Sequence, residues 1–213
     1  MTITRRDTLI LAAAASFATV AGLGTAQAQE GTTKDVAALA NVALPDRVLG
    51  EADAGVTVIE YASPTCPHCA AFHNDVYPQF KAEYVDTGKV KYILRPFTRN
   101  VLDAVVFMLA EAAGEDRYHE VVNTYFRTFD QWASSERPRD AILEIAKQLG
   151  FTEQSFDAAL TNQDLFTAME TMREQALNEF KLEGTPTFYI NGKQLTGGKT
   201  LEELKAEIDP LLA

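Results

Sequence analysis

The order of apolar and polar positions divides the chain into a strand-forming beginning, a long helical middle and a strand-forming end. Residues 56–62 and 89–95 are short runs rich in β-branched and aromatic residues, and they predict two buried strands, the second ended by Pro96. After the helical middle, Asn191-Gly192 stands between two further strand-like runs and predicts a β-hairpin. This order predicts a small sheet built from both ends of the chain.

Between residues 101 and 181 apolar positions recur every three or four residues, which predicts helices throughout. Start and stop signals separate them into residues 101–110, residues 118–129, a helix opened by Pro138 and closed by Gly150, a short one capped by Thr152, and residues 164–180. This block contains no cysteine, no glycine-rich phosphate loop and no metal-ligand spacing. We therefore interpret its apolar stripes as core.

Three further helices are predicted within or beside the strand-forming beginning and end of the chain. One begins at Pro67, where proline is favoured at a first helical position, and is expected to kink at Pro78. A terminal helix follows the capping box formed by Thr200 and Glu203. Ahead of the first strand, residues 34–41 predict a short helix or a linker.

The N-terminus has the pattern of an export signal. Arg5-Arg6 precedes an apolar run too short to span a membrane, and Ala26-Gln27-Ala28 is a cleavage motif, so residues 1–28 are predicted to be removed. The twin-arginine route fits Arg5-Arg6, although the flanking residues depart from that motif, so the export route stays open. Export places the cysteines in an oxidising compartment.

The overall charge restricts the class of partner. The chain has 19 basic and 30 acidic residues, for a net charge of −11, and removal of Arg5, Arg6 and Asp7 with the signal leaves 17 and 29. Nucleic acid is excluded as an expected partner, because phosphate binding needs clustered Lys and Arg. A chain of this size buries a sufficient core without disulfides, so its two cysteines are not needed for stability.

Those two cysteines form the motif Cys66-Pro67-His68-Cys69 at the start of a predicted helix. The leading sulfur then faces unpaired backbone N–H groups and the positive end of the helix dipole, which favour thiolate over thiol. His68 can add positive charge or a donor beside it. A stabilised thiolate means a stabilised reduced form, so the motif predicts a disulfide that is readily donated to another protein.

A structural zinc site is the alternative for the same residues. It needs four ligands, and besides the cysteine pair the chain offers only His68, His73 and His119. Because His68 lies inside the motif, it could hardly join its neighbours in a tetrahedral cage. We therefore expect redox chemistry and no metal, and we expect His73 to cap or decorate its helix.

Glu60 interrupts an otherwise apolar predicted strand six residues before Cys66. It is either a carboxylate at a strand face that meets water, or a buried acid beside the disulfide. In the second case it would influence the proton at Cys69 as the bond is made and broken.

The strand leading into Cys66-Pro67-His68-Cys69, together with Thr185-Pro186 in residues 184–192, resembles the DsbA-like family of exported thiol–disulfide oxidoreductases. The resemblance covers nearly the whole chain after the signal. It implies an α/β structure, the thioredoxin fold with an inserted helical domain. The expected division is residues 1–28 as signal peptide, 29–47 as N-terminal extension, 48–98 with 182–213 as thioredoxin domain, and 99–181 as inserted domain.

The resemblance also implies roles for the residues of the site. Cys66 would be the exposed nucleophile that forms a mixed disulfide, and Cys69 the buried partner that resolves it. Pro186 would be cis and pack against the disulfide, while the backbone of Thr185 pairs with bound substrate. Glu60 matches the family's buried acid.

Partners and a basic companion for Glu60 follow from the same resemblance. Lys91 is expected to be that companion. Reduced exported proteins would be the substrates, a quinone-linked membrane oxidase of the DsbB type would recycle the protein, and no cofactor is needed. The expected location is the periplasm.

Thr185 keeps an alternative function open, because threonine at this position is associated with isomerase-type relatives. Those relatives are dimers built through an N-terminal domain, for which residues 29–47 leave no room, so we expect a monomeric oxidase first and an isomerase or reductase second. An exported peptide-binding chaperone, using the groove around Pro186, is the third hypothesis.

Overall fold

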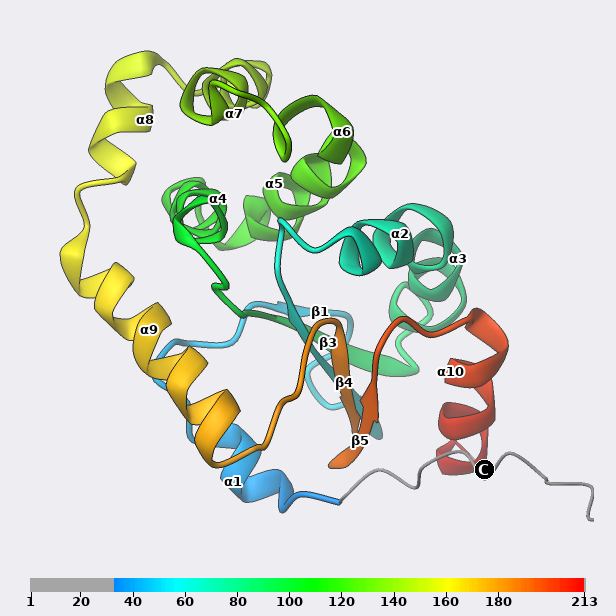
Figure 1. The fold of residues 1–213 in the computed structure, drawn as a ribbon. Helices are drawn as coiled ribbons and strands as arrows, with labels where there is room; N and C mark the ends of the chain where they lie inside the picture. The colour runs from blue at the N-terminus through cyan, green and yellow to red at the C-terminus, as the bar shows by residue number, and fades with distance from the viewer. Residues whose placement is uncertain (1–32, 213) are drawn as a thin grey trace, which may run out of the picture. The chain divides into compact units, whose positions relative to one another are not determined.

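A five-stranded sheet in the order β1-β3-β2-β4-β5 forms the centre of the fold (Figure 1). The computed structural model describes residues 33–212, so the predicted signal peptide lies outside the described residues. The strands are β1 (Val48–Leu49), β2 (Val56–Ala62), β3 (Val90–Pro96), β4 (Thr187–Ile190) and β5 (Lys193–Thr196). The strand predicted over residues 89–95 therefore includes Pro96, which pairs in register with Ala62.

The central strand β2 pairs with one strand from the beginning of the chain and one from its end. It runs parallel to β3 and antiparallel to β4, so that Glu60 lies opposite both Leu94 and Phe188. The hairpin predicted at Asn191-Gly192 is confirmed between β4 and β5. Gly192 has a φ of +91°, and a Cβ there would meet the carbonyl oxygen of Lys34 at 2.4 Å, so the turn requires glycine.

Helices surround the sheet. They are α1 (Val36–Ala40), α2 (Pro67–Asp75), α3 (Tyr77–Phe80), α4 (Val101–Ala112), α5 (Glu115–Arg127), α6 (Phe129–Trp132), α7 (Pro138–Gln148), α8 (Glu153–Ala159), α9 (Gln163–Asn178) and α10 (Leu201–Ile208). A π-helical turn, Lys81–Val85, continues α3. Within residues 33–212, no helix is both long and apolar enough to cross a bilayer.

Local signals in the sequence account for most helix boundaries. The capping boxes at Thr152 and at Thr200 are both formed, and Gly150 follows α7 with a φ of +90°. The kink expected at Pro78 is a break at Val76, two residues earlier, where α2 ends and α3 begins. The separate short helix α6 was not predicted.

Helices α4 to α9 lie between β3 and β4 in the chain, and they complete the α/β thioredoxin fold (Figure 1). One continuous apolar core joins these helices to the sheet, with Tyr92, Phe126 and Phe188 among its fully covered side chains. Helix α2 packs against α5, so the helix that begins at the cysteines rests on the helical block. The boundaries of a separate inserted domain at residues 99–181 stay a prediction.

A buried ion pair ties the segment before β1 to the sheet. Arg95 on β3 is 1% exposed, and its Nε and Nη2 atoms donate to the carboxylate oxygens of Asp46 at 2.7 and 2.8 Å. Its Nη1 atom donates to the hydroxyl of Tyr61 at 3.0 Å. A planar guanidinium suits this two-pronged contact with a carboxylate.

Candidate active site

The cysteine motif lies at the start of α2, as predicted. Cys66 is the N-cap residue in an extended conformation, Pro67 takes the first helical position, and Cys69 lies in the first turn. Both thiols are free. Pro67 and His68 are exposed. This geometry aims the backbone N–H groups of the first turn at the leading sulfur.

The expectation that Cys66 is exposed is wrong. The residue is 3% exposed and Cys69 is 0% exposed. The cause lies far along the chain, where the loop before β4 passes over the motif and the Cys66 thiol donates to the carbonyl oxygen of Thr185 at 3.2 Å. A partner must therefore reach the Cys66 sulfur at the Thr185 loop.

The two thiols have opposite electrostatics. A hydrogen bond with Cys69 is the main effect that lowers the pKa of Cys66; burial opposes it, and the Thr185 side chain and the backbone N–H groups of His68 and Cys69 lower the pKa further, to about 5. Burial raises the pKa of Cys69 well above its ordinary value, and the hydrogen bond to Cys66 and the negative charge of Glu60 add to this. The first sulfur is thus held as an anion and the second as a neutral thiol.

The peptide bond between Thr185 and Pro186 is cis, as predicted. Pro186 is buried and Thr185 is half-buried. Two hydrogen bonds hold this loop in place. Thr187 Oγ1 donates to the carbonyl oxygen of Gly184, and the backbone N–H of Gly197 donates to the carbonyl oxygen of Pro186. The loop that meets the Cys66 sulfur is therefore firmly held.

Glu60 is buried, which decides between the two interpretations of its sequence position. Its side chain is 0% exposed, and its carboxylate oxygens lie 3.1 Å from Nε2 of His73 and 2.5 Å from the hydroxyl of Tyr92. The expectation that His73 caps or decorates its helix is wrong, because its ring lies in the core against β2. The sequence contains no periodic signal for this pairing, since it joins a strand to a separate helix.

Lys91 is not the basic companion of Glu60. It pairs in register with Thr57, one position before Tyr92 on β3. Successive side chains of a strand point to opposite faces, and Tyr92 points toward Glu60. Lys91 therefore lies on the other face of the sheet, and His73 takes the place expected for it.

A second buried carboxylate, Asp103, escaped the sequence analysis. It is 0% exposed and accepts hydrogen bonds from the Ser63 hydroxyl at 2.8 Å, the Thr65 N–H at 2.7 Å and the Arg99 N–H at 2.8 Å. Burial raises its pKa, and these hydrogen bonds act in the opposite direction. Asp103 thereby fixes the loop that enters Cys66 to the start of α4. Its place three residues after the N-cap Asn100 was the available signal.

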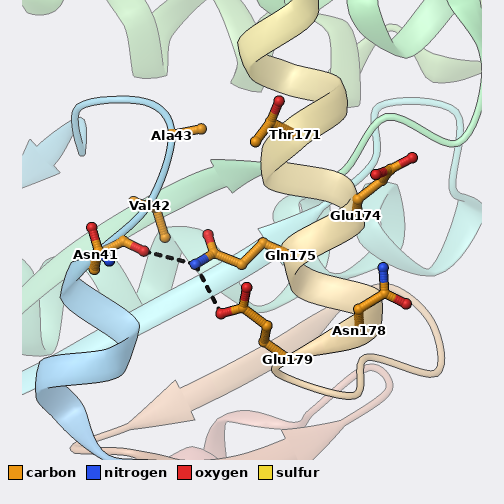
Figure 2. A pocket seen from close by; sticks show the side chains of 8 residues that line it. All are labelled: Asn41, Val42, Ala43, Thr171, Glu174, Gln175, Asn178 and Glu179. Carbon is orange, nitrogen blue, oxygen red and sulfur yellow. Dashed lines mark hydrogen bonds between the residues drawn. The ribbon is translucent and has the colours of Figure 1, made fainter.

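A pocket of about 400 Å³ lies elsewhere, between α9 and the segment after α1 (Figure 2). Gln175 crosses it, with Nε2 donating to the Asn41 carbonyl at 2.8 Å and to Glu179 at 3.2 Å. Neither cysteine lines this pocket.

Among the described residues, no group of three or more His, Cys, Asp and Glu side chains is arranged to hold a metal ion. The cysteine motif is the candidate site.

Comparisons with known proteins agree with this fold. A family model described as Thioredoxin matches residues 43–210. A Rickettsia felis protein that bears the provisional name protein-disulfide oxidoreductase is 32% identical over 170 residues, which are 78% of this chain. The chain spans about 60% of the length of that relative. "Disulfide bond formation protein D" of Bacillus subtilis is 26% identical over 76% of this chain and 75% of its own. The crystal structure of Wolbachia pipientis α-DsbA1 superposes with a TM-score of 0.76 at 27% identity, covering 82% of this chain and 95% of that one.

Proposed function

Because the chain belongs to the thioredoxin family, among its DsbA-like members, we propose that it is a thiol–disulfide oxidoreductase that oxidises exported proteins. It donates the Cys66–Cys69 disulfide through a mixed disulfide on Cys66. The Bacillus subtilis relative, which is named for disulfide bond formation, supports this direction of transfer.

The observation that carries the proposal is the opposite behaviour of the two thiols. Cys66 has a pKa of about 5, so it is almost entirely thiolate near neutral pH, while Cys69 has a pKa well above the ordinary value. A thiolate with a low pKa is a good leaving group, and its stabilisation favours the dithiol over the disulfide. Transfer of the disulfide from the protein to a substrate is therefore thermodynamically favourable.

The reaction consists of two exchanges. A substrate thiolate attacks Cys66 Sγ, the bond to Cys69 breaks, and the electron pair passes to Cys69, which takes up a proton. The second substrate thiol then loses its proton and attacks the substrate sulfur of the mixed disulfide. Cys66 leaves as the stabilised thiolate, so two electrons have moved from substrate to protein.

The Thr185 loop supplies the docking site in this proposal. The Thr185 carbonyl already contacts the Cys66 sulfur, so an extended substrate that pairs with the Thr185 backbone brings its own sulfur to the same place. Reoxidation by a quinone-linked membrane protein of the DsbB type, action in the periplasm as a monomer, and cleavage of residues 1–28 belong to the same proposal.

One observation favours a second function, disulfide isomerisation or reduction. The Thr185 side chain is among the groups that lower the pKa of Cys66, and so it takes part in setting the stability of the thiolate. An isomerase or reductase would act from the dithiol form and would reshuffle or reduce a scrambled substrate.

Mixing the oxidised protein, without residues 1–28, with a reduced two-cysteine peptide tests the proposal. We expect stoichiometric peptide oxidation by the wild type and none with Cys66→Ala. Cys69→Ala, mixed instead with a one-cysteine peptide carried as its glutathione disulfide, should release glutathione and hold the peptide as a stable mixed disulfide on Cys66. Reshuffling of a scrambled substrate faster than net oxidation would favour the isomerase. Peptide binding that persists in Cys66→Ala without any oxidation by the wild type would indicate the chaperone.

A further inference from the structure

The loop that follows β3 lies directly beside the loop that enters Cys66. One buried carboxylate joins them, because Asp103 Oδ1 accepts the backbone N–H of Thr65 at 2.7 Å and Oδ2 accepts that of Arg99 at 2.8 Å. Asn100 adds a second link, since its Nδ2 donates to Thr65 Oγ1 at 2.8 Å. Arg99 is therefore held next to Thr65, the residue that precedes the reactive cysteine.

The side chain of Arg99 is available to another molecule. Arg99 is exposed, and among the residues that the structure describes its guanidinium has no hydrogen-bond or ion-pair partner. The contact that fixes Arg99 in place uses its backbone N–H and not its side chain. Other arginines differ in this respect, since each of the following pairs with a carboxylate: Arg47, Arg95, Arg117, Arg137 and Arg139.

The other charges near Cys66 do not neutralise this guanidinium. Asp103 is buried, and its oxygens accept their hydrogen bonds from two backbone N–H groups and a hydroxyl. Lys181 and Glu183, in the loop before β4, are both exposed and have opposite charges, so their effects on an approaching charge oppose each other. His68 is exposed and adds no negative charge.

This local positive charge contrasts with the rest of the molecule. The chain has a net charge of −11, which repels acidic segments and substrate thiolates. A free guanidinium beside the reactive sulfur opposes that repulsion at the place where the substrate must arrive. An extended substrate advances about 3.3 Å per residue, so a residue one or two positions from its cysteine comes within reach of the Arg99 loop.

We propose that Arg99 is a specificity-determining residue that binds an acidic side chain next to the cysteine of the substrate. The inference deepens the proposed function and rests on it. It names the substrate class as exported proteins whose reactive cysteine is flanked by Asp or Glu. A guanidinium suits this role, because its planar N–H donors match the two oxygens of a carboxylate.

The oxidation rates of two peptides test this preference. Both are reduced two-cysteine peptides of equal length, one with aspartate and the other with lysine beside each cysteine, and each is mixed in excess with the oxidised protein lacking residues 1–28. We expect Arg99→Gln to lower the ratio of the acidic-peptide rate to the basic-peptide rate about two- to fivefold, the size of an exposed ion pair. Arg99→Glu should lower it further. Because the same peptides react with every variant, the ionisation of their own thiols cancels from the comparison.

Arg127→Gln is the matched control, because it removes the same charge elsewhere on the surface. Arg127 is exposed and donates to the Thr124 hydroxyl at 2.8 Å. It ends α5, which lies beside the end of α2 away from Cys66, where Asn74 donates to the carbonyl of Phe126 at 3.2 Å. This variant should keep the wild-type ratio. High salt should narrow the gap between the wild type and Arg99→Gln, since exposed charges are screened.

The outcomes separate the inference from the proposed function. A wild-type ratio in Arg99→Gln would overturn the inference and leave the oxidase standing. An equal fall of the ratio in Arg127→Gln would also overturn it, because net charge and not the position of Arg99 would then set the preference. If the wild type oxidises neither peptide, the proposed function fails, and the role of Arg99 fails with it.

Discussion

The Cys66 thiol lies 3.2 Å from the carbonyl oxygen of Thr185, although 119 positions separate the two residues. The contact brings the helix that follows β2 against the loop that precedes β4, and both strands are neighbours in the sheet. The reactive sulfur is therefore enclosed between two segments that are far apart in the sequence and adjacent in the fold. Its chemistry depends on both of them.

The first prediction concerns the effect of Cys69 on Cys66. The hydrogen bond with Cys69 is the main effect that lowers the pKa of Cys66. Because a hydrogen bond to a charged group contributes about 1.5–3 kcal/mol, Cys69→Ala should raise the pKa of Cys66 by about one to two units. Ultraviolet absorbance of the thiolate measures this, with Cys66→Ala as the blank. An unchanged pKa would mean that the helix terminus alone stabilises the anion.

The second prediction concerns the stability of the reduced form against pH. The pKa of Cys66 falls from 9.0 unfolded to about 5 folded, so the thiolate contributes stability that is present above pH 9 and lost as pH falls to about 5. The pKa of Cys69 is raised above 9.0, so it titrates outside this window. Between pH 5 and pH 9.0, the free energy of unfolding of the reduced protein should therefore rise, relative to that of the oxidised protein, by about 1.4 kcal/mol per pH unit.

Denaturant unfolding of both redox forms at several pH values measures that slope. Reduced Cys66→Ser serves as the control, since it has no thiolate and should show no such rise. A difference between the redox forms that is flat across the window, or falls with pH, would contradict the assigned stabilisation of Cys66.

The third prediction concerns Asp103. Its two carboxylate oxygens accept from Ser63, Thr65 and Arg99, and an asparagine would turn an NH₂ group toward one of these donors. Because an unsatisfied buried group costs about 1–3 kcal/mol, Asp103→Asn should lower the free energy of unfolding, measured with denaturant, by that amount. Asp53→Asn, at an exposed turn residue, is the control. Equal stability of the two variants would show that the carboxylate is not needed to hold the loop.

The fourth prediction concerns the buried ion pair of Arg95 and Asp46. Asp46→Ala leaves the guanidinium buried without its partner and should cost about 3–5 kcal/mol. Replacing Arg95 by methionine in the same protein should recover part of that loss. Asp140→Ala, which breaks an exposed pair with Arg137, should cost less than about 1 kcal/mol. Urea unfolding compares the three, and a double variant no more stable than Asp46→Ala would contradict this account.

Local signals made much of the fold predictable. Strand β2, the hairpin at Asn191-Gly192 and the capping box at Thr200 depend on residues within a few positions of each other. The start of α2 at Pro67 and the cysteine pair in its first turn likewise depend only on residues close together in the sequence. Neighbours in sequence are sufficient to define such features.

The errors and omissions in the site come from contacts between distant segments. The environment of His73 depends on Asn123, 50 positions away, and Cys66 is covered by Thr185, 119 positions away. Lys91 was chosen by its strand, but a shift of one position along a strand changes the face of the sheet. No periodicity records which helix packs on which, so these relationships needed the structure.

The equilibrium of the Cys66–Cys69 disulfide with glutathione tests the central claim most directly. A Cys66 pKa of about 5 stabilises the dithiol by about 3 kcal/mol near neutral pH, relative to a thiol that stays protonated, which corresponds to a potential about 60 mV more oxidising. We predict that reduced glutathione converts most of the protein to the dithiol, with release of glutathione disulfide. A Cys66–Cys69 bond that persists under these conditions, as the disulfides of ordinary exported proteins do, would contradict the role of donor.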